Sequence, residues 1–246
     1  MGALHAGHAE LFKLAKSKSD FVVASIFVNP LQFDDPQDLA NYPRTPESDI
    51  EIAADSGVTH LWLPTYEEIY PADAKKMSAG ELGKIYEGEN RSGHFDGVVT
   101  VVSRLFELLK PKSAIFGEKD FQQLTLIRAI AKDVEIIAAP TVRELDGLAM
   151  SSRNVRLDKE NRTAALIIYK ALIAASNSAN LSEARKHLHD VCATQPLFKL
   201  DYAQIIDEHD FSIATDSTLN PRAIIAGWLN GVRLIDNMQM RVGGQR

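Results

Sequence analysis

The chain has 246 residues, 45% of them hydrophobic and 24% charged, with a net charge of −6. This length suits one large domain or two small ones and can bury a core without disulfides. The acidic balance argues against binding to nucleic acid or to an anionic membrane. The one cysteine, Cys192, excludes an intrachain disulfide and a cysteine metal cage. Since the sequence shows neither a signal-peptide pattern nor an apolar run of about 18 residues, we expect a cytoplasmic protein without a membrane span.

Strand and helix patterns alternate along residues 1–141. Helices are predicted at 9–18, 46–55, 98–109 and 121–131, and strands at 21–28, 58–63, 113–116 and 134–138. The first two strand segments are almost entirely apolar, which is typical of strands buried on both faces. This alternation predicts an α/β fold with right-handed crossovers and a doubly wound, parallel, Rossmann-like sheet.

The pattern changes in residues 142–246. Two helical stretches, 159–176 and 181–193, are followed by predicted strands at 201–207, 222–229 and 232–236. Helices followed by strands indicate a smaller α+β domain. We therefore expect a domain of residues 1–141 that binds ligands and a domain of residues 142–246 that closes over them.

The chain opens on a turn rich in small residues and histidine, Met1-Gly2-Ala3-Leu4-His5-Ala6-Gly7-His8, which leads into a helix. Small residues let the backbone approach a phosphate, and a helix N-terminus supplies free N–H groups. His5 and His8 can donate hydrogen bonds to phosphate oxygens. Two alternatives remain for the pair: solvated side chains near a terminus, or a metal site, for which no third ligand is evident nearby.

Two more polar turns lie at the ends of predicted strands, where ligands bind in open α/β sheets. In the segment 27–33, Gln32 can hold a hydroxyl or a carboxylate. In the segment 117–123, Lys119 suits a phosphate, and Asp120 can accept from a ribose hydroxyl or cap a helix. Taken alone, the segment 27–33 fits an ordinary turn better than a binding site, and the segment 117–123 fits either.

The segment 150–154 places Ser151, Ser152 and Arg153 together as a compact clamp for an anion. It lies where the domain pattern changes, so it could close over a cleft, although a polar linker with a helix cap is the alternative. Residues 91–95 could assist a substrate anion or simply lead into a helix. The acidic stretch of Asp34, Asp35 and Asp38 could be a solvated loop or face Mg²⁺.

Together, and in this order, these segments resemble the pantothenate synthetase family. That family carries M-G-x-L-H-x-G-H, F-V-N-P-x-Q-F, G-H-F-x-G-V, G-E-K-D-x-Q-Q and D-G-L-A-x-S-S-R-N. The chain matches them at residues 1–8, 27–33, 93–98, 117–123 and 146–154, and it adds a family-like run at 233–237. The resemblance covers nearly the whole chain. The broader kinship is with H-x-G-H nucleotidyltransferases.

The resemblance implies an AMP-forming ligase that acts in two steps. The carboxylate of pantoate attacks the α-phosphorus of ATP, which gives pantoyl adenylate and pyrophosphate. The amine of β-alanine then attacks the activated carbonyl, which gives pantothenate and AMP. The resemblance also implies that Mg²⁺ accompanies ATP and that the protein is a homodimer.

The resemblance assigns roles residue by residue. His5, His8, Lys119 and Arg153 would be catalytic, with His8 the proton donor, and Gln32 and Gln123 would hold pantoate. Nucleotide contacts would come from Met1, Gly2, Ala3, Leu4, His5, Ala6, Gly7, His8, Gly117, Glu118, Lys119, Asp120, Val142, Met150, Ser151, Ser152 and Arg153. Of these, Gly117 and Asp120 would hold the ribose.

The sequence departs from the family pattern at its start. Family members carry an N-terminal helix and strand that end in Pro-Thr just before the first motif, and this sequence begins at the motif. We therefore expect a sheet that lacks its usual first strand. Because that strand would be central to the sheet, its loss would expose neighbouring edges and lower stability or activity.

Two other functions compete with the ligase. One is a nucleotidyltransferase that leaves the nucleotide on its product, against which Gln32 and Gln123 argue. The other is a nucleotide-binding remnant that does not turn over. Release of AMP only in the presence of an amine identifies the ligase, and ATP binding without pyrophosphate release identifies the remnant.

Overall fold

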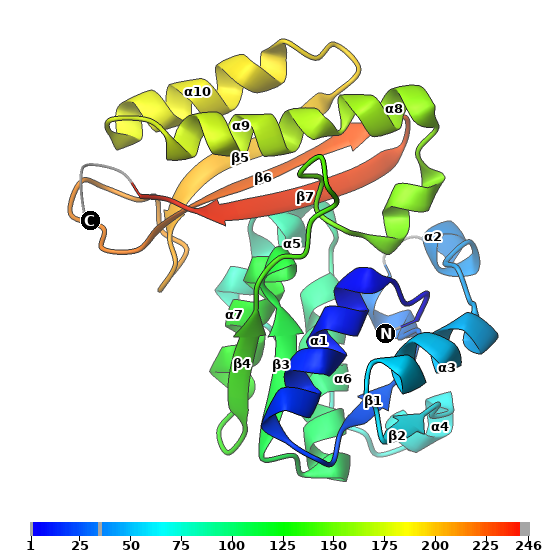
Figure 1. The fold of residues 1–246 in the computed structure, drawn as a ribbon. Helices are drawn as coiled ribbons and strands as arrows, with labels where there is room; N and C mark the ends of the chain where they lie inside the picture. The colour runs from blue at the N-terminus through cyan, green and yellow to red at the C-terminus, as the bar shows by residue number, and fades with distance from the viewer. Residues whose placement is uncertain (1, 34–35, 242–246) are drawn as a thin grey trace. The chain divides into compact units, whose positions relative to one another are not determined.

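A computed structural model describes residues 2–33 and 36–241 (Figure 1). They fall into two compact units, Met1–Thr141 and Val142–Arg246, each with hydrophobic clusters of its own. Within the described ranges, no helix combines the length and the apolar character that crossing a membrane would require.

The strands of the first unit pair in parallel, as the alternating pattern predicts. β1 (Val23–Ser25) pairs with β2 (His60–Trp62), and β3 (Ser113–Gly117) pairs with β4 (Glu135–Ala139). The α/β class is thereby confirmed. In the described part of the chain these strands make two separate two-stranded sheets and not one continuous sheet.

The expectation that the first two strands are buried on both faces is wrong at several positions. Phe21 is 63% exposed, Val23 37% and Leu63 49%. Both strands are also short, with three residues each. A strand is buried on both faces when it lies inside a larger sheet that is covered on both sides. Among the described residues, β1 and β2 have only each other as strand partners.

Four longer helices accompany these strands: α1 (Ala6–Lys18), α3 (Pro46–Asp55), α6 (His94–Leu109) and α7 (Phe121–Ile130). The predicted helix at 46–55 is confirmed, whereas α1 and α6 begin earlier than predicted. Short helices that the sequence did not reveal are α2 (Pro36–Ala40), α4 (Tyr66–Ile69) and α5 (Glu87–Asn90). One core cluster of this unit gathers the apolar face of α6 with residues of α7.

The helix α6 approaches the end of the first strand segment very closely. Its Gly97 packs against the short 3-10 turn η1 (Pro30–Gln32), and a Cβ at Gly97 would lie 2.2 Å from the Leu31 carbonyl oxygen. The Asn29 side-chain amide also donates to the Gly97 carbonyl at 3.0 Å. This contact holds the turn η1, and with it Gln32, against helix α6.

The second unit consists of helices followed by an antiparallel sheet, as predicted. After the 3-10 turn η4 (Ser152–Arg156) come α8 (Lys159–Ala164), α9 (Leu166–Ser176) and α10 (Leu181–Ala193). The sheet has the order β5–β6–β7, formed by Lys199–Asp207, Pro221–Leu229 and Val232–Gln239. Helices α9 and α10 cover one face of this sheet (Figure 1). Cys192 is buried in that core, and burial raises the pKa of its thiol to about 11.

We predict that Gly97→Ala destabilises the protein, although alanine favours a helix over glycine by about 1 kcal/mol. The added methyl meets backbone atoms of Leu31 and Gln32, so η1 must shift, at a cost of about 1–3 kcal/mol. Thermal unfolding measures the effect. Gly117→Ala is the matched control, because no atom lies within 4 Å of a Cβ placed there. Equal melting temperatures for the two variants would contradict the prediction.

Candidate functional site

The two histidines of the first turn are organised by the start of α1. His5 is the N-cap residue, and its Nδ1 accepts from the Gly7 N–H at 3.1 Å. The Nδ1 of His8 accepts from the His5 N–H at 3.3 Å, and the two rings lie 4.1 Å apart. Since Nδ1 is an acceptor in both neutral rings, each carries its proton on Nε2. The pair therefore presents two N–H donors of defined tautomer.

Burial keeps both rings neutral. It lowers the pKa of His8 to about 3, with a further contribution from the neighbouring His5. Burial also lowers the pKa of His5, and the ammonium of Lys119 acts in the same direction on both rings. Asp120 raises both pKa values, by less than burial lowers them. The charges of the Lys119–Asp120 turn therefore act on both histidines of the first turn.

A buried carboxylate holds the first turn in place. Asp49 of α3 is 1% exposed and accepts from the N–H groups of Ala3 at 3.0 Å and Leu4 at 2.7 Å. Thr45 donates its hydroxyl to the same carboxylate at 3.0 Å. Ala3 has a φ of 49°, so the carboxylate stabilises a backbone conformation that is unfavourable for alanine. Asp49 thereby orients the chain that enters α1.

The remaining members of the first turn support this geometry. Gly2, Leu4 and Gly7 are buried, whereas Ala6 is exposed in the first turn of α1. The sequence also assigned Met1 to the site, and that residue lies outside the described residues.

The second turn of the site follows β3. Gly117 ends the strand, the 3-10 turn η3 (Glu118–Asp120) comes next, and α7 begins at Phe121. Lys119 Nζ lies 3.6 Å from Asp120 Oδ1, and the two side chains are 20% and 49% exposed. A side chain at Gly117 would meet open space. A ligand can therefore approach this backbone without displacing protein atoms.

Gln32 is fixed by neighbours on three elements. Asn29 Nδ2 lies 3.4 Å from Gln32 Oε1, and the Tyr70 hydroxyl donates to Asn29 Oδ1 at 2.9 Å. The Gln32 carbonyl is 2.7 Å from His94 Nδ1 and 3.4 Å from Arg91 Nη2. Burial raises the pKa of Tyr70, so its hydroxyl stays protonated and remains a donor. Both the side chain and the backbone of Gln32 thus have defined positions.

The two adjacent glutamines of α7 differ in their surroundings. Gln122 is buried and binds the backbone around residues 82–87: its Nε2 donates to the carbonyls of Leu82 and Ile85, and its Oε1 accepts from the Glu87 N–H. Gln123 is half-buried on the neighbouring face of the helix. Only Gln123 was assigned to substrate from the sequence, and Gln122 anchors a loop.

The candidate residues of the second unit cluster around a short hairpin. The Met150 N–H donates to the Val142 carbonyl at 2.9 Å, so these two residues face each other at its base. Ser151 is the N-cap of η4 and accepts from the Arg153 N–H at 3.2 Å. Ser152 and Arg153 occupy the first turn of η4. The proposed anion clamp is therefore one compact local structure.

Several residues that hold the site were missed at the sequence level. They are Asp49, Asn29 with its partner Tyr70, and, in the second unit, Glu144 and Arg162. A signal existed only for Asp49, which is a carboxylate four residues before the buried Ala53 on the inward face of a helix. The others depend on contacts between distant segments, which one sequence does not reveal.

Residues 2–33 and 36–241 contain no group of three or more His, Cys, Asp or Glu side chains placed to hold a metal ion. The alternative reading of His5 and His8 as metal ligands therefore finds no third ligand in this part of the chain. Asp34 and Asp35 lie outside the described residues, as does the side chain of Asp38.

Comparison with known proteins identifies close relatives. The family model of pantoate-beta-alanine ligase matches residues 1–239. The pantothenate synthetase of Acidothermus cellulolyticus is 45% identical in an alignment of 258 positions that covers 98% of this chain and 84% of the relative. That of Aquifex aeolicus is 43% identical in an alignment of 260 positions that covers 98% of this chain and 89% of the relative.

Solved structures agree with the sequence relatives. The crystal structure of pantothenate synthetase from Thermus thermophilus superposes with a TM-score of 0.93 at 42% identity, covering 97% of this chain and 90% of that one. The pantoate-beta-alanine ligase of Francisella tularensis, complexed with beta-gamma ATP and beta-alanine, gives a TM-score of 0.80 at 38% identity, with coverage of 97% and 87%.

We predict that His8 makes the protein less stable in mild acid. Its pKa in the folded state is about 3, against 6.5 for an unperturbed histidine, so protonation favours the unfolded chain. The stability is complete well above pH 6.5 and falls as the pH drops from there toward 3. Between pH 7 and pH 5 the loss is on the order of 2 kcal/mol.

Urea unfolding of the wild type and of His8→Gln at pH 7 and pH 5 measures this loss. The variant should lose less stability than the wild type over that interval. His209→Gln, at an exposed position of the second unit, is the control and should behave like the wild type. An identical pH dependence for His8→Gln and the wild type would show that His8 is not the titrating group.

Proposed function

Because the chain belongs to the pantoate–β-alanine ligase family, we propose that it condenses pantoate with β-alanine to pantothenate at the expense of ATP. ATP is cleaved to AMP and pyrophosphate, and pantoyl adenylate is the intermediate. The observation that carries this function is the turn of His5 and His8, where two neutral rings with free Nε2–H donors lie beside the charge of Lys119.

In the first step a carboxylate oxygen of pantoate attacks the α-phosphorus, and the bond to the β-phosphate breaks. Negative charge grows on the leaving pyrophosphate and on the oxygens around phosphorus. Donors placed in advance at those oxygens stabilise this charge. His5, His8 and Lys119 are the candidates for that role, and Gly117 and Asp120 would receive the ribose.

The neutrality of His8 defines what it can do. Before ATP binds, burial lowers the pKa of His8 to about 3, so near pH 7 the ring is neutral and presents an Nε2–H donor. We assign it as a hydrogen-bond donor to the phosphate oxygens. Because the negative charge of bound phosphates raises the pKa of a neighbouring imidazole, the proton-donor role that the family resemblance implies is retained.

In the second step the amine of β-alanine attacks the activated carbonyl carbon. The amine loses a proton, and the bond from that carbon to the AMP oxygen breaks. No covalent intermediate with the protein is needed, so positioning and charge stabilisation supply the catalysis. Gln32 and Gln123 would hold pantoate. The fixed position of Gln32 between Asn29, His94 and Arg91 supports its part in this.

The second unit would contribute to nucleotide binding. Ser151, Ser152 and Arg153 form the anion clamp, and Val142 and Met150 offer backbone groups at the base of the hairpin. We propose that residues 1–141 are the ATP- and pantoate-binding domain and that residues 142–246 close over the active site. Support comes from the compactness of each unit and from the position of the clamp directly after their boundary.

The remaining proposals rest on family kinship. Mg²⁺ would arrive with ATP, held mainly by phosphate oxygens, and this agrees with the lack of a ready-made ligand cluster in the described residues. A homodimeric state is proposed on the family resemblance alone, and the cytoplasmic location stays a prediction from the sequence. A sedimentation measurement that found only monomer would remove the first of these.

We predict that the purified chain releases pyrophosphate from ATP when pantoate is present, and that AMP and pantothenate appear only after β-alanine is added. His8→Ala should reduce pyrophosphate release by roughly 100-fold, which is typical for the loss of one preorganised donor. His209→Ala is the control. A product that retains the nucleotide would identify a nucleotidyltransferase, and an unchanged rate in His8→Ala would remove His8 from the mechanism.

A last proposal concerns the sheet of the first unit. The family resemblance places a helix and a strand ahead of the first turn, and we propose that the strand belongs between the two parallel pairs of one doubly wound sheet. The separation of β1–β2 from β3–β4 and the exposure of Phe21 and Val23 support this. A chain extended with the corresponding segment of a relative should melt at a higher temperature. Equal melting temperatures and equal activity would contradict the proposal.

A further inference from the structure

Residues 142–150 form a tight hairpin immediately before the clamp of Ser151, Ser152 and Arg153. The Glu144 N–H donates to the Leu148 carbonyl at 2.8 Å, and Arg143 pairs with Ala149 in an antiparallel bridge. Because the clamp follows Met150 without a spacer, the placement of the hairpin determines where the clamp lies.

One side of the hairpin is fixed by a buried ion pair. Arg143 binds both carboxylate oxygens of Asp236 on β7, at 2.6 and 3.0 Å, and Asp236 is only 3% exposed in its side chain. The Arg143 guanidinium also lies over the ring of Tyr169 on α9, 4.9 Å from its centroid. Gly147 has a φ of 96°, and a Cβ there would lie 2.1 Å from the Tyr169 ring. The hairpin is therefore tightly seated on the sheet and on α9.

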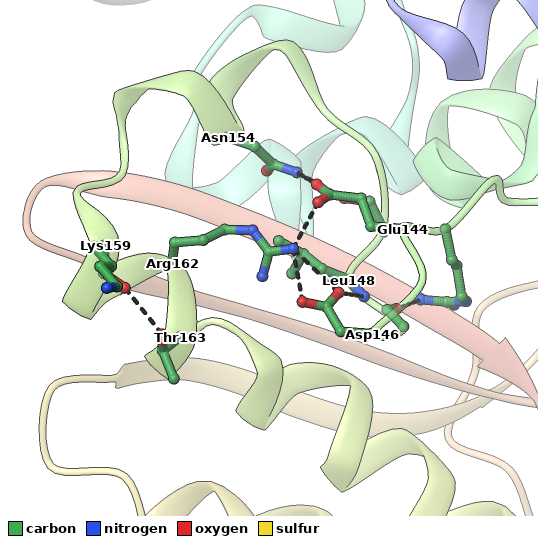
Figure 2. A network of polar contacts seen from close by, with 10 residues as sticks. Glu144, Asp146, Leu148, Asn154, Lys159, Arg162 and Thr163 are labelled. Atoms are coloured by element: carbon green, nitrogen blue, oxygen red, sulfur yellow. Dashed lines mark hydrogen bonds and ion pairs between the residues drawn. The ribbon is translucent and has the colours of Figure 1, made fainter.

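The other side of the hairpin is held by Arg162 of α8. Figure 2 shows its guanidinium between two carboxylates of the hairpin. Arg162 Nη2 lies 2.6 Å from Glu144 Oε2 and 2.9 Å from Asp146 Oδ2. This contact uses one oxygen of Glu144 and leaves the other oxygen directed toward η4.

That second oxygen binds Asn154, the residue directly after the clamp. Asn154 Nδ2 donates to Glu144 Oε1 at 3.2 Å (Figure 2). It also donates to the Ala149 carbonyl at 3.1 Å. An amide NH₂ has two hydrogens, and both have an acceptor here. Asn154 Oδ1 is buried and finds no donor in the described part of the chain. The reversed amide would set oxygen against two oxygens, so the NH₂ end fixes the side chain.

We propose that Glu144 is a positioning residue for the Ser151-Ser152-Arg153 clamp and that it acts through Asn154. Arg162 fixes one carboxylate oxygen, the other oxygen fixes Asn154, and Asn154 sets the first turn of η4, where the Asn154 N–H also meets the Ser151 carbonyl at 3.0 Å. The inference rests on the proposed function for the phosphate role of the clamp.

The chain offers a matched control for this role. Asp146 binds the same guanidinium as Glu144, yet within the described residues it makes no contact with Asn154. Asp146→Asn therefore weakens the contact with Arg162 and leaves the bond to Asn154 in place. Asn154→Asp places a carboxylate against Glu144 and the Ala149 carbonyl, and so repels both.

The first readout is independent of catalysis. Trypsin cleaves after Arg153 and Arg156, so the cleavage rate at these two bonds, followed by mass spectrometry, reports how firmly η4 is held. Glu144→Ala, Asn154→Ala and Asn154→Asp should accelerate this cleavage severalfold. Asp146→Asn should stay close to the wild type. This result is expected whether or not the chain turns over, so it separates the positioning role from the proposed function.

The second readout is kinetic. The kcat/KM for ATP in pantoate-dependent pyrophosphate release should fall roughly 10- to 100-fold in Glu144→Ala and Asn154→Ala, as expected for a misplaced binding group. The KM for β-alanine should not change. The Glu144→Ala/Asn154→Ala double variant should have a kcat/KM no lower than that of the more impaired single variant, because each substitution removes the same hydrogen bond between Glu144 and Asn154.

Two outcomes would overturn the inference. They are equal losses in Asp146→Asn and Glu144→Ala, and losses in the Glu144→Ala/Asn154→Ala double variant that multiply independently. Either of these would show that the ion pair with Arg162, or general stability, matters and not the bond to Asn154. A wild type that releases no pyrophosphate would instead remove the proposed function, and the cleavage rates would still decide the positioning role.

Discussion

Two backbone N–H groups just before α1 donate hydrogen bonds to the buried carboxylate of Asp49, and the geometry of the histidine turn depends on that contact. Asp49 binds Ala3 and Leu4, which directs the chain so that His5 caps α1 and His8 follows three residues later. Burial then keeps both rings neutral. A neutral ring of fixed tautomer is a ready donor toward growing negative charge, and it needs no reorganisation when the reaction begins.

The same principle recurs at the other polar turns. Gln32 is held by Asn29, which in turn accepts from Tyr70, forty-one positions further along the chain. In the second unit, Glu144 and Asn154 hold the end of the clamp. In each case a side chain that carries no assigned chemistry determines the position of one that does. Such supporting contacts allow exposed loops to present polar groups with defined geometry.

The sequence predicted local structure best where local signals are strong. The helices at 46–55 and 181–193 match because local signals mark their starts: Pro46 opens the first, and the Asn180 side chain caps the second by accepting from the Glu183 N–H. Burial was predicted less well: Phe21 and Val23 belong to an apolar run, but the layers that cover a strand are contributed by distant segments. Of the candidate residues, Gln32, Lys119 and Asp120 stand out by their places at strand ends, whereas most of the other assignments depend on the family resemblance. Supporting residues such as Tyr70 and Arg162 depend on tertiary contacts, which one sequence does not reveal.

The central claim is that the histidine turn activates a carboxylate by joining it to the α-phosphorus of ATP. Pantoate labelled with oxygen-18 in its carboxylate tests this directly, because the attacking oxygen stays with phosphorus when the amine later breaks the carbon–oxygen bond. The account predicts that one labelled oxygen per turnover appears in the phosphate of AMP, measured by mass spectrometry. AMP free of label, with pantothenate still formed, would contradict it.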